Sequence, residues 1–193
     1  MRLNVAIFIF NDVEVLDFAG PFEVFSVASQ LHQNRLFNVF TLAENKNPVK
    51  AINGLSVNPD YCFETAPKAD ILIIAGGEGT KALLKHPKVL NNLKTIHNHT
   101  TYTATICSGS RIAAVLGLLD GKPYCTHHQV YDDMLNLVPT AIPQKSKRFT
   151  NSGKLYTSGG ISAGIDLSFH LLNKIYGNEV VKTTASYMEY RFS

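Results

Sequence analysis

Short, almost wholly apolar runs recur along this chain and alternate with segments of helical character. Two of the clearest lie at residues 3–10 and 69–75. Each is too short to span a membrane as a helix, and such runs are typical of strands that are buried on both faces. Strands of this kind, separated by helices, predict a mostly parallel sheet covered by helices on both faces, which is an α/β three-layer sandwich.

Turn signals divide the chain into the elements of such a fold. Pro21 suits the first turn of a helix, so we expect a loop at residues 11–20 and a helix from Pro21 to residue 31. Asn53-Gly54 and residues 151–153 predict hairpins at residues 50–59 and 148–158. No repeat or linker interrupts the pattern, which indicates a single domain over residues 1–193. The other expected strands are residues 37–42, 101–106 and 124–126. One further helix is expected directly after Gly79, and the remaining expected helices cover residues 87–97, 111–116, 130–137, 162–176 and 179–190.

Composition excludes several classes of function. The chain is 45% hydrophobic and 17% charged, which is typical of a globular domain. Its formal net charge is only +3 and no run of lysine or arginine forms a basic footprint, so we expect no nucleic acid partner. Three cysteines do not make a disulfide framework, and they fit a reducing compartment. Without a recognisable leader or membrane span, we expect a cytoplasmic protein with no membrane partner.

Cys107 is the residue with the most chemical information. It lies where the predicted strand at residues 101–106 gives way to Ser108-Gly109 and then to a helix. This strand-turn-helix pattern is typical of a nucleophile elbow, although Thr105 stands where glycine is usual. The positive end of the following helix should favour the thiolate and lower the pKa of the thiol. The alternative is a buried core cysteine, as Cys62 and Cys125 are expected to be.

Other reactive residue types are expected close to Cys107. In a parallel α/β sheet, the loops at the carboxyl ends of the strands meet at one edge. That rule brings together Asp17, Gly76-Gly77, Cys107 and His127. A thiol, a carboxylate, an imidazole and backbone amides make up the inventory for nucleophilic catalysis. His127 is an auxiliary candidate, and a purely structural role for it stays open.

Four stretches carry a family resemblance, namely residues 15–23, 75–77, 106–109 and 157–166. In their order and spacing the chain resembles the DJ-1/PfpI (ThiJ) superfamily. Its motifs are most similar to those of isonitrile hydratase-like members and of sensor-like domains fused to AraC-type regulators. The resemblance implies a flavodoxin-like sandwich that assembles as a homodimer, acts on a small molecule and uses neither a metal nor an organic cofactor.

The resemblance also implies roles for single residues. Cys107 matches the family nucleophile and Asp17 the acidic residue that contacts it, while the amides of Gly77 and Ser108 match the oxyanion hole. Ser108 replaces the threonine usual in isonitrile hydratase-like members, and keeps a hydroxyl. Protease-like members have histidine after the cysteine, so protease activity is not favoured here. Better-studied DJ-1-like members have glutamate in the acidic position, so glyoxalase or deglycase activity is not favoured either.

The leading hypothesis is a cysteine-dependent hydratase that converts an isonitrile to an N-substituted formamide. One alternative is a non-catalytic thiol sensor or small-molecule-binding module, and another is glyoxalase-like hydration of α-oxoaldehydes. Asp17 also has a structural alternative, because an aspartate can cap a helix that opens at Pro21. The sequence leaves the physiological substrate open.

Overall fold

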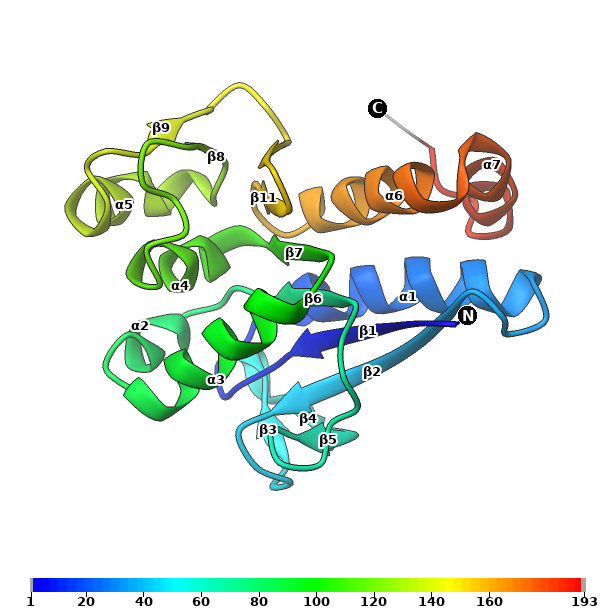
Figure 1. Cartoon of the computed structure of the whole chain (residues 1–193), viewed down its shortest axis with the longest axis horizontal. Helices are drawn as coiled ribbons and strands as arrows, with labels where there is room; N and C mark the ends of the chain where they lie inside the picture. Colours follow the sequence, from blue (N-terminus) through cyan, green and yellow to red (C-terminus); the bar gives the residue numbers. More distant parts are fainter. Residues whose placement is uncertain (1, 192–193) are drawn as a thin grey trace.

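A computed structural model describes residues 2–191 of the chain, and its centre is a seven-stranded sheet in the order β10-β11-β7-β6-β1-β2-β5 (Figure 1). Neighbouring strands are parallel except for the hairpin pair β10–β11. This arrangement confirms the predicted, mostly parallel sheet. Its strands are β1 (Leu3–Phe8), β2 (Phe37–Ala43), β5 (Tyr61–Cys62), β6 (Ile71–Ile74), β7 (Tyr102–Thr105), β10 (Phe149–Ser152) and β11 (Leu155–Ser158).

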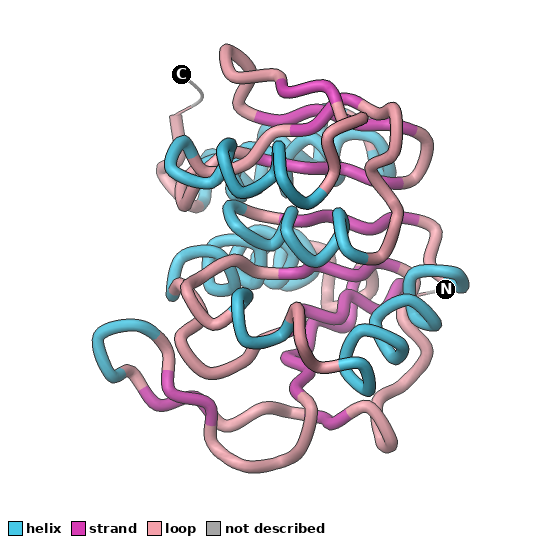
Figure 2. Tube along the Cα trace, turned by 90° about the vertical axis from the view of Figure 1, so that its left-hand side faces the viewer, coloured by secondary structure: helices cyan, strands magenta, loops and turns pink. Residues whose placement is uncertain are grey.

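Helices complete the sandwich, and Figure 2 shows the strands stacked between them. Three long helices contact one another in one layer: α1 (Val15–Leu31), α6 (Ala163–Tyr176) and α7 (Asn178–Tyr187). A second layer is connected through contacts between α2 (Thr80–Leu83), α3 (Pro87–His99), α4 (Ser110–Val115) and α5 (Tyr131–Leu137). The three-layer α/β sandwich of the flavodoxin-like type is therefore confirmed.

The chain also forms several short strands and 3-10 turns. An antiparallel pair, β3 (Val49–Lys50) and β4 (Ser56–Val57), encloses the 3-10 turn η1 (Ile52–Gly54) and projects from the molecule (Figure 2). Asn53 and Gly54 adopt φ angles of 65° and 92°, so this hairpin prediction is confirmed. The remaining elements are β8 (Pro123–Tyr124), β9 (Ile142–Pro143), η2 (Cys107–Gly109) and η3 (His128–Val130).

The apolar runs form the centre of the core. Residues 71–74 of β6 are at most 1% exposed, as are residues 5–9 around β1. β1 pairs with β6 on one side and with β2 on the other. Burial on both faces explains why these strands lack the apolar-polar alternation of a half-exposed sheet.

The predicted start of the first helix is wrong. α1 begins at Val15, and Pro21 lies inside it. Proline has no N–H, so Pro21 cannot donate a backbone hydrogen bond to the carbonyl of Asp17 in the first turn of α1. The helix therefore lacks one backbone hydrogen bond. The packing of Phe18, Gly20 and Pro21 in the interior outweighs that cost. Asp17 therefore lies in the first turn of α1, and the hypothesis that it caps a helix opening at Pro21 is wrong.

Candidate active site

Cys107 lies on the predicted sharp turn between β7 and α4. Its φ angle is 55°, in the left-handed region that a residue with a side chain rarely adopts. The backbone is held from both sides: the Cys107 amide donates to the carbonyl of Gly159 at 3.2 Å, and the Cys107 carbonyl accepts from Thr126 Oγ1 at 2.9 Å. Strain that the surroundings hold in place in this way is typical of functional turns. The elbow prediction is thus matched by the local geometry.

Gly76 allows the neighbouring loop to approach this turn. A Cβ atom at position 76 would lie 2.6 Å from the amide nitrogen of Ser108 and 2.8 Å from the Cβ of Cys107. Neither contact is possible in a relaxed structure, so only glycine fits there. The close approach brings the loop after β6 against the loop after β7.

Asp17 lies beneath the thiol. Its side chain is fully buried, and Oδ2 accepts the amide N–H of Gly76 at 2.9 Å. Oδ1 has no hydrogen-bond partner among residues 2–191. Burial raises the pKa of Asp17 to about 7, and the thiol of Cys107 interacts with the carboxyl group. Near neutral pH the protonated and ionised forms of Asp17 are both populated, so this carboxyl group can give and accept a proton.

The predicted lowering of the Cys107 pKa is wrong. Burial, followed by the negative charge of Asp17, raises the pKa of this thiol to about 12. The amides of Ser108 and Ile161 act in the opposite direction but do not outweigh burial. The influence of a helix end is worth only about 1 kcal/mol, whereas removing a thiolate from water costs more. The resting residue is therefore a thiol rather than a thiolate.

The two predicted oxyanion donors, the amides of Gly77 and Ser108, have different partners in the structure. The Gly77 amide donates to Ser108 Oγ at 2.8 Å, and this hydroxyl donates in turn to the Gly77 carbonyl at 3.0 Å. The Ser108 amide faces the sulfur of Cys107, together with the amide of Ile161. Gly77 as an oxyanion donor stays a prediction that requires the Ser108 hydroxyl to turn away. Ile161 was not among the predicted site residues, because its φ of 49° has no signature in the sequence.

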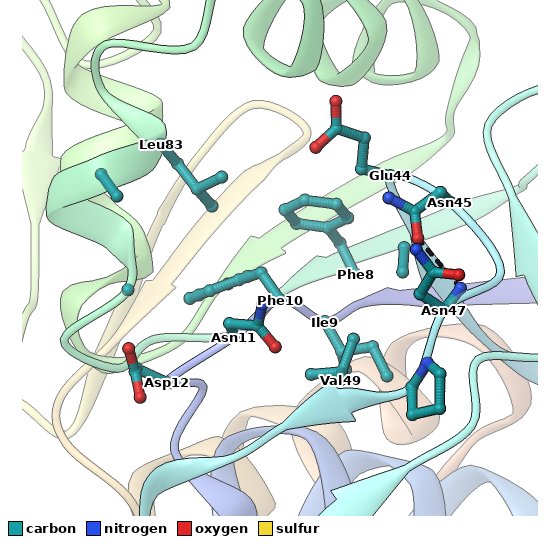
Figure 3. Close-up of a pocket in the computed structure, with 14 residues that line it drawn as sticks. Phe8, Ile9, Phe10, Asn11, Asp12, Glu44, Asn45, Asn47, Val49 and Leu83 are labelled. Carbon is teal, nitrogen blue, oxygen red and sulfur yellow. Dashed lines mark hydrogen bonds between the residues drawn. The ribbon is translucent and has the colours of Figure 1, made fainter.

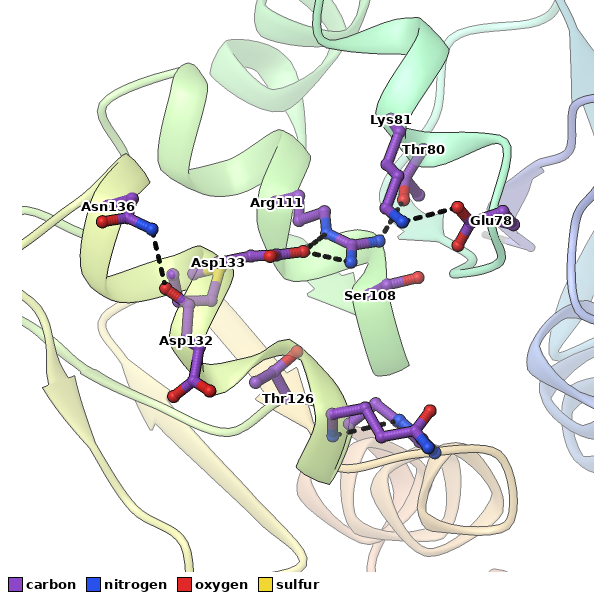
Figure 4. A network of polar contacts seen from close by, with 12 residues as sticks. Glu78, Thr80, Lys81, Ser108, Arg111, Thr126, Asp132, Asp133 and Asn136 are labelled. Carbon is purple, nitrogen blue, oxygen red and sulfur yellow. Dashed lines mark hydrogen bonds and ion pairs between the residues drawn. The ribbon is translucent and has the colours of Figure 1, made fainter.

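A polar network supports the glycine loop from behind (Figure 4). Arg111 is 5% exposed, and its guanidinium donates to Asp133 Oδ2 at 2.9 Å and to Thr80 Oγ1 at 3.0 Å. Thr80 Oγ1 then donates to the carbonyl of Gly77 at 2.8 Å. This network extends from α5 through α4 and α2 to the loop that touches Ser108. This network was not predicted, although a charged residue one helical turn after Cys107 in an apolar run is a signal for it.

A cavity of about 300 Å³ opens over Cys107. Three further candidates line it, Gly77, Ser108 and His127, so the structure brings these residues together as predicted. Asp17 is absent from the lining because it lies behind the sulfur, at 0% exposure. The remaining lining residues are Glu14, Ile52, Glu78, Lys81, Arg111, Gln129, Val130, Asp133 and Ile161.

His127 stands at the wall of this cavity. Burial and then the neighbouring His128 lower the pKa of His127. Nδ1 of His127 accepts a hydrogen bond from the amide N–H of Gln129 at 3.4 Å, so Nε2 is the ring nitrogen outside this contact.

Within the described part of the chain, no cluster of three or more metal-binding side chains is found.

Comparison with known proteins agrees with this geometry. A model of the DJ-1/PfpI family matches residues 3–174. The isonitrile hydratase of Pseudomonas putida is 30% identical over 192 residues, covering 98% of this chain and 79% of that protein. The HTH-type transcriptional regulator CdhR of Pseudomonas aeruginosa is 30% identical over 167 residues, covering 86% of this chain. The chain spans only 48% of the length of that regulator.

Solved structures give the same fold. A ThiJ/PfpI family protein from Pseudomonas syringae superimposes with a TM-score of 0.89 at 23% identity, covering 100% of this chain and 77% of the other. None of the helices described for residues 2–191 is long and apolar enough to cross a membrane. The sandwich, the cysteine on its elbow and the family match over most of the sequence lead to one conclusion: this chain is a member of the DJ-1/PfpI family.

Proposed function

We propose that the chain is a cysteine-dependent hydratase that converts a small isonitrile to an N-substituted formamide. The observation that carries this proposal is the pairing of the Cys107 thiol with the buried Asp17, whose pKa of about 7 suits proton transfer near neutral pH. The similarity to an isonitrile hydratase over 98% of the chain supports the choice of substrate class.

The first step forms a covalent adduct. The sulfur of Cys107 attacks the terminal isonitrile carbon while the thiol proton passes to the ionised Asp17. Asp17 then delivers that proton to the same carbon, which gives a thioimidate with a new C–S and a new C–H bond. Asp17 ends this step ionised, as it began, so it acts as a proton carrier. A thiol is sufficient at the start because deprotonation accompanies attack.

Water completes the reaction. It adds across the C=N bond of the thioimidate, and the nitrogen gains a proton as the carbon gains oxygen. Collapse of this tetrahedral adduct breaks the C–S bond, returns a proton to the sulfur and releases the formamide. The amides of Ser108 and Ile161, which face the sulfur, are placed to stabilise charge beside it. The net change is isonitrile plus water to formamide.

A turnover screen tests the proposal. The purified chain is incubated with aliphatic and aromatic isonitriles, and with methylglyoxal, while formamide or hydroxy acid is followed by NMR. We expect formamide from isonitriles, and a loss on the order of 10³-fold or more in Cys107→Ser. Cys62→Ser is the matched control, because Cys62 is also buried but lies in β5. This strand is at the edge of the sheet, separated from β7 by three other strands. Formamide production no faster than in buffer excludes the reaction.

A sensor module is the second candidate, because the similarity to the regulator CdhR covers 86% of this chain. In that case a ligand of the Cys107 cavity raises the melting temperature without being consumed. Mild peroxide would then oxidise Cys107 to sulfenic or sulfinic acid. The same isonitrile samples distinguish the two candidates, because binding without product favours the sensor.

We also propose that the chain forms a homodimer in the cytoplasm. Large apolar side chains are partly exposed on several elements, among them Leu16 at 37% and Ile161 at 38%. Exposed apolar surface of this kind is compatible with a partner surface. The three cysteines are free thiols, which fits a reducing compartment.

A further inference from the structure

A second cavity of about 300 Å³ lies at the carboxyl ends of β1 and β2 (Figure 3). Its walls come from the end of β1 and the loop after it, the segment between β2 and β3, and α2. Cys107 and the other candidate catalytic residues are not among its lining residues. The carboxyl edge of a parallel sheet is where α/β folds hold ligands, and the volume is at the lower end of the range for small-molecule sites.

The inner surface of this cavity is apolar and aromatic. Phe8 and Phe10 lie side by side with ring centroids 5.6 Å apart, and both rings are labelled in the middle of Figure 3. Val49 and Leu83 complete this surface, and all four side chains are buried to 9% exposure or less. Such a surface binds the hydrocarbon part of a ligand, and aromatic rings also attract cations.

The rim carries negative charge. Asp12 and Glu44 contribute carboxyl groups, and Asn45 and Asn47 contribute amides. The described lining includes no lysine or arginine. Lys46 stands between the two asparagines in the sequence, but its ammonium group donates to the carbonyl of Pro59 at 3.3 Å and so points elsewhere. The imidazole of His86 lies beside this rim, with its Nε2 3.4 Å from Glu44 Oε1.

We infer that this cavity is a binding site for a small organic cation, in which an ammonium group meets the rim at Glu44 and a compact aromatic or aliphatic body lies on Phe10, the more exposed member of the Phe8–Phe10 pair. Charge complementarity selects this class, because the lining carries two carboxylates and no lysine or arginine, and the one imidazole described beside it contacts Glu44 itself. A neutral ligand would gain only the apolar contact. The inference is independent of the proposed hydratase reaction.

Binding of four matched probes to the full chain tests the inference by titration calorimetry. Benzylamine and benzyltrimethylammonium are cationic, benzyl alcohol is neutral and benzoate is anionic. We expect both cations to bind about tenfold more tightly than benzyl alcohol, which corresponds to one partly buried ion pair, and benzoate to bind more weakly than all three. Equal affinity of the cations and the alcohol overturns the inference.

Variants locate the site. Glu44→Gln should weaken benzylamine binding about tenfold, and Ala82→Phe should abolish it by filling the cavity from an exposed position of α2. The matched control is Glu78→Gln, which removes the same charge from the wall of the Cys107 cavity. Binding that is insensitive to both Glu44→Gln and Ala82→Phe, or that responds to Glu78→Gln instead, places the cation elsewhere and overturns the inference.

Discussion

The carboxyl group of Asp17 is buried against the thiol of Cys107 and raises the pKa of that thiol. Burial, together with the charge of Asp17, keeps the resting nucleophile neutral. Burial also raises the pKa of Asp17 to about 7, so this carboxyl group titrates near neutral pH. Removal of the carboxyl charge should therefore change both the reactivity of the sulfur and the dependence of stability on pH.

Alkylation tests the first effect. Asp17→Asn removes a negative charge beside Cys107, so the pKa of the thiol should fall and iodoacetamide should label Cys107 about two- to tenfold faster at pH 8. Peptide mapping after limited labelling gives the rate for each cysteine. Cys107 should also react before the other two, because it lines a cavity whereas Cys125 is 0% exposed and Cys62 Sγ contacts Thr65 Oγ1. Slower labelling of Cys107 in Asp17→Asn contradicts the electrostatic relationship.

Turnover tests the role of Asp17 as proton carrier. Under the proposed mechanism, Asp17→Asn keeps the fold and Cys107 but loses about 10²–10⁴-fold in isonitrile hydration. Glu78→Gln is the matched control, because Glu78 lines the same cavity but pairs with Lys81 and does not lie beneath the thiol. Full activity in Asp17→Asn, with Cys107→Ser inactive, would remove Asp17 from the mechanism and keep the nucleophile.

Stability should depend on pH through Asp17. The pKa of Asp17 is about 7 in the folded state, against 3.8 for an aspartate exposed to water, so the folded state binds the proton more tightly. This contribution to stability is complete below pH 3.8 and is lost as pH rises through about 7, at about 1.4 kcal/mol per pKa unit. Urea unfolding at pH 5 and pH 8 should show a larger loss in the wild type than in Asp17→Asn.

His97 changes the pH dependence of stability in the opposite direction over part of this pH range, so both proteins in the comparison must contain it. Burial lowers the pKa of His97 to about 4, so its contribution to stability is lost as pH falls from 6.5 towards 4. Because both proteins contain His97, the difference between them isolates Asp17. An identical pH dependence in wild type and Asp17→Asn would show that this carboxyl group is already ionised in the folded state at pH 5.

The network behind the glycine loop gives a prediction about Thr80. Thr80→Val removes the hydroxyl that joins Arg111 to the Gly77 carbonyl, and it leaves a buried donor unpaired. We expect a loss of about 1–3 kcal/mol in the free energy of unfolding, and a fall in kcat with little change in KM. Thr80→Ser restores the hydroxyl and should recover kcat. Equal kcat values in the two variants would limit this network to stability.

Sedimentation tests the proposed homodimer. The chain has a mass of 21.3 kDa, so a dimer should sediment at twice that mass at concentrations on the order of 10 µM. The melting temperature should then rise with protein concentration, because association stabilises the folded state. A single 21.3 kDa species at such concentrations, with a melting temperature independent of dilution, contradicts the proposal.

Local patterns were enough to predict much of the fold. The buried strands β1 and β6, the hairpins at η1 and at β10–β11, and the elbow at Cys107 all follow from runs of apolar residues and from turn chemistry. These features depend on interactions between residues that are close in the chain. Hence the sequence predicted the sandwich and the meeting of Gly77, Cys107, Ser108 and His127 at one cavity.

Tertiary packing decided the rest. Pro21 marks a helix start by local rules, yet α1 begins at Val15 because the interior accepts its first turn. The thiol pKa follows burial and Asp17 rather than the nearby helix end, because desolvation arises only when α1 and the loops after β6 and β7 surround the sulfur. The link from Arg111 through Thr80 to Gly77 joins residues that are distant in the chain. Such long-range electrostatics and hydrogen bonds exist only in the assembled fold.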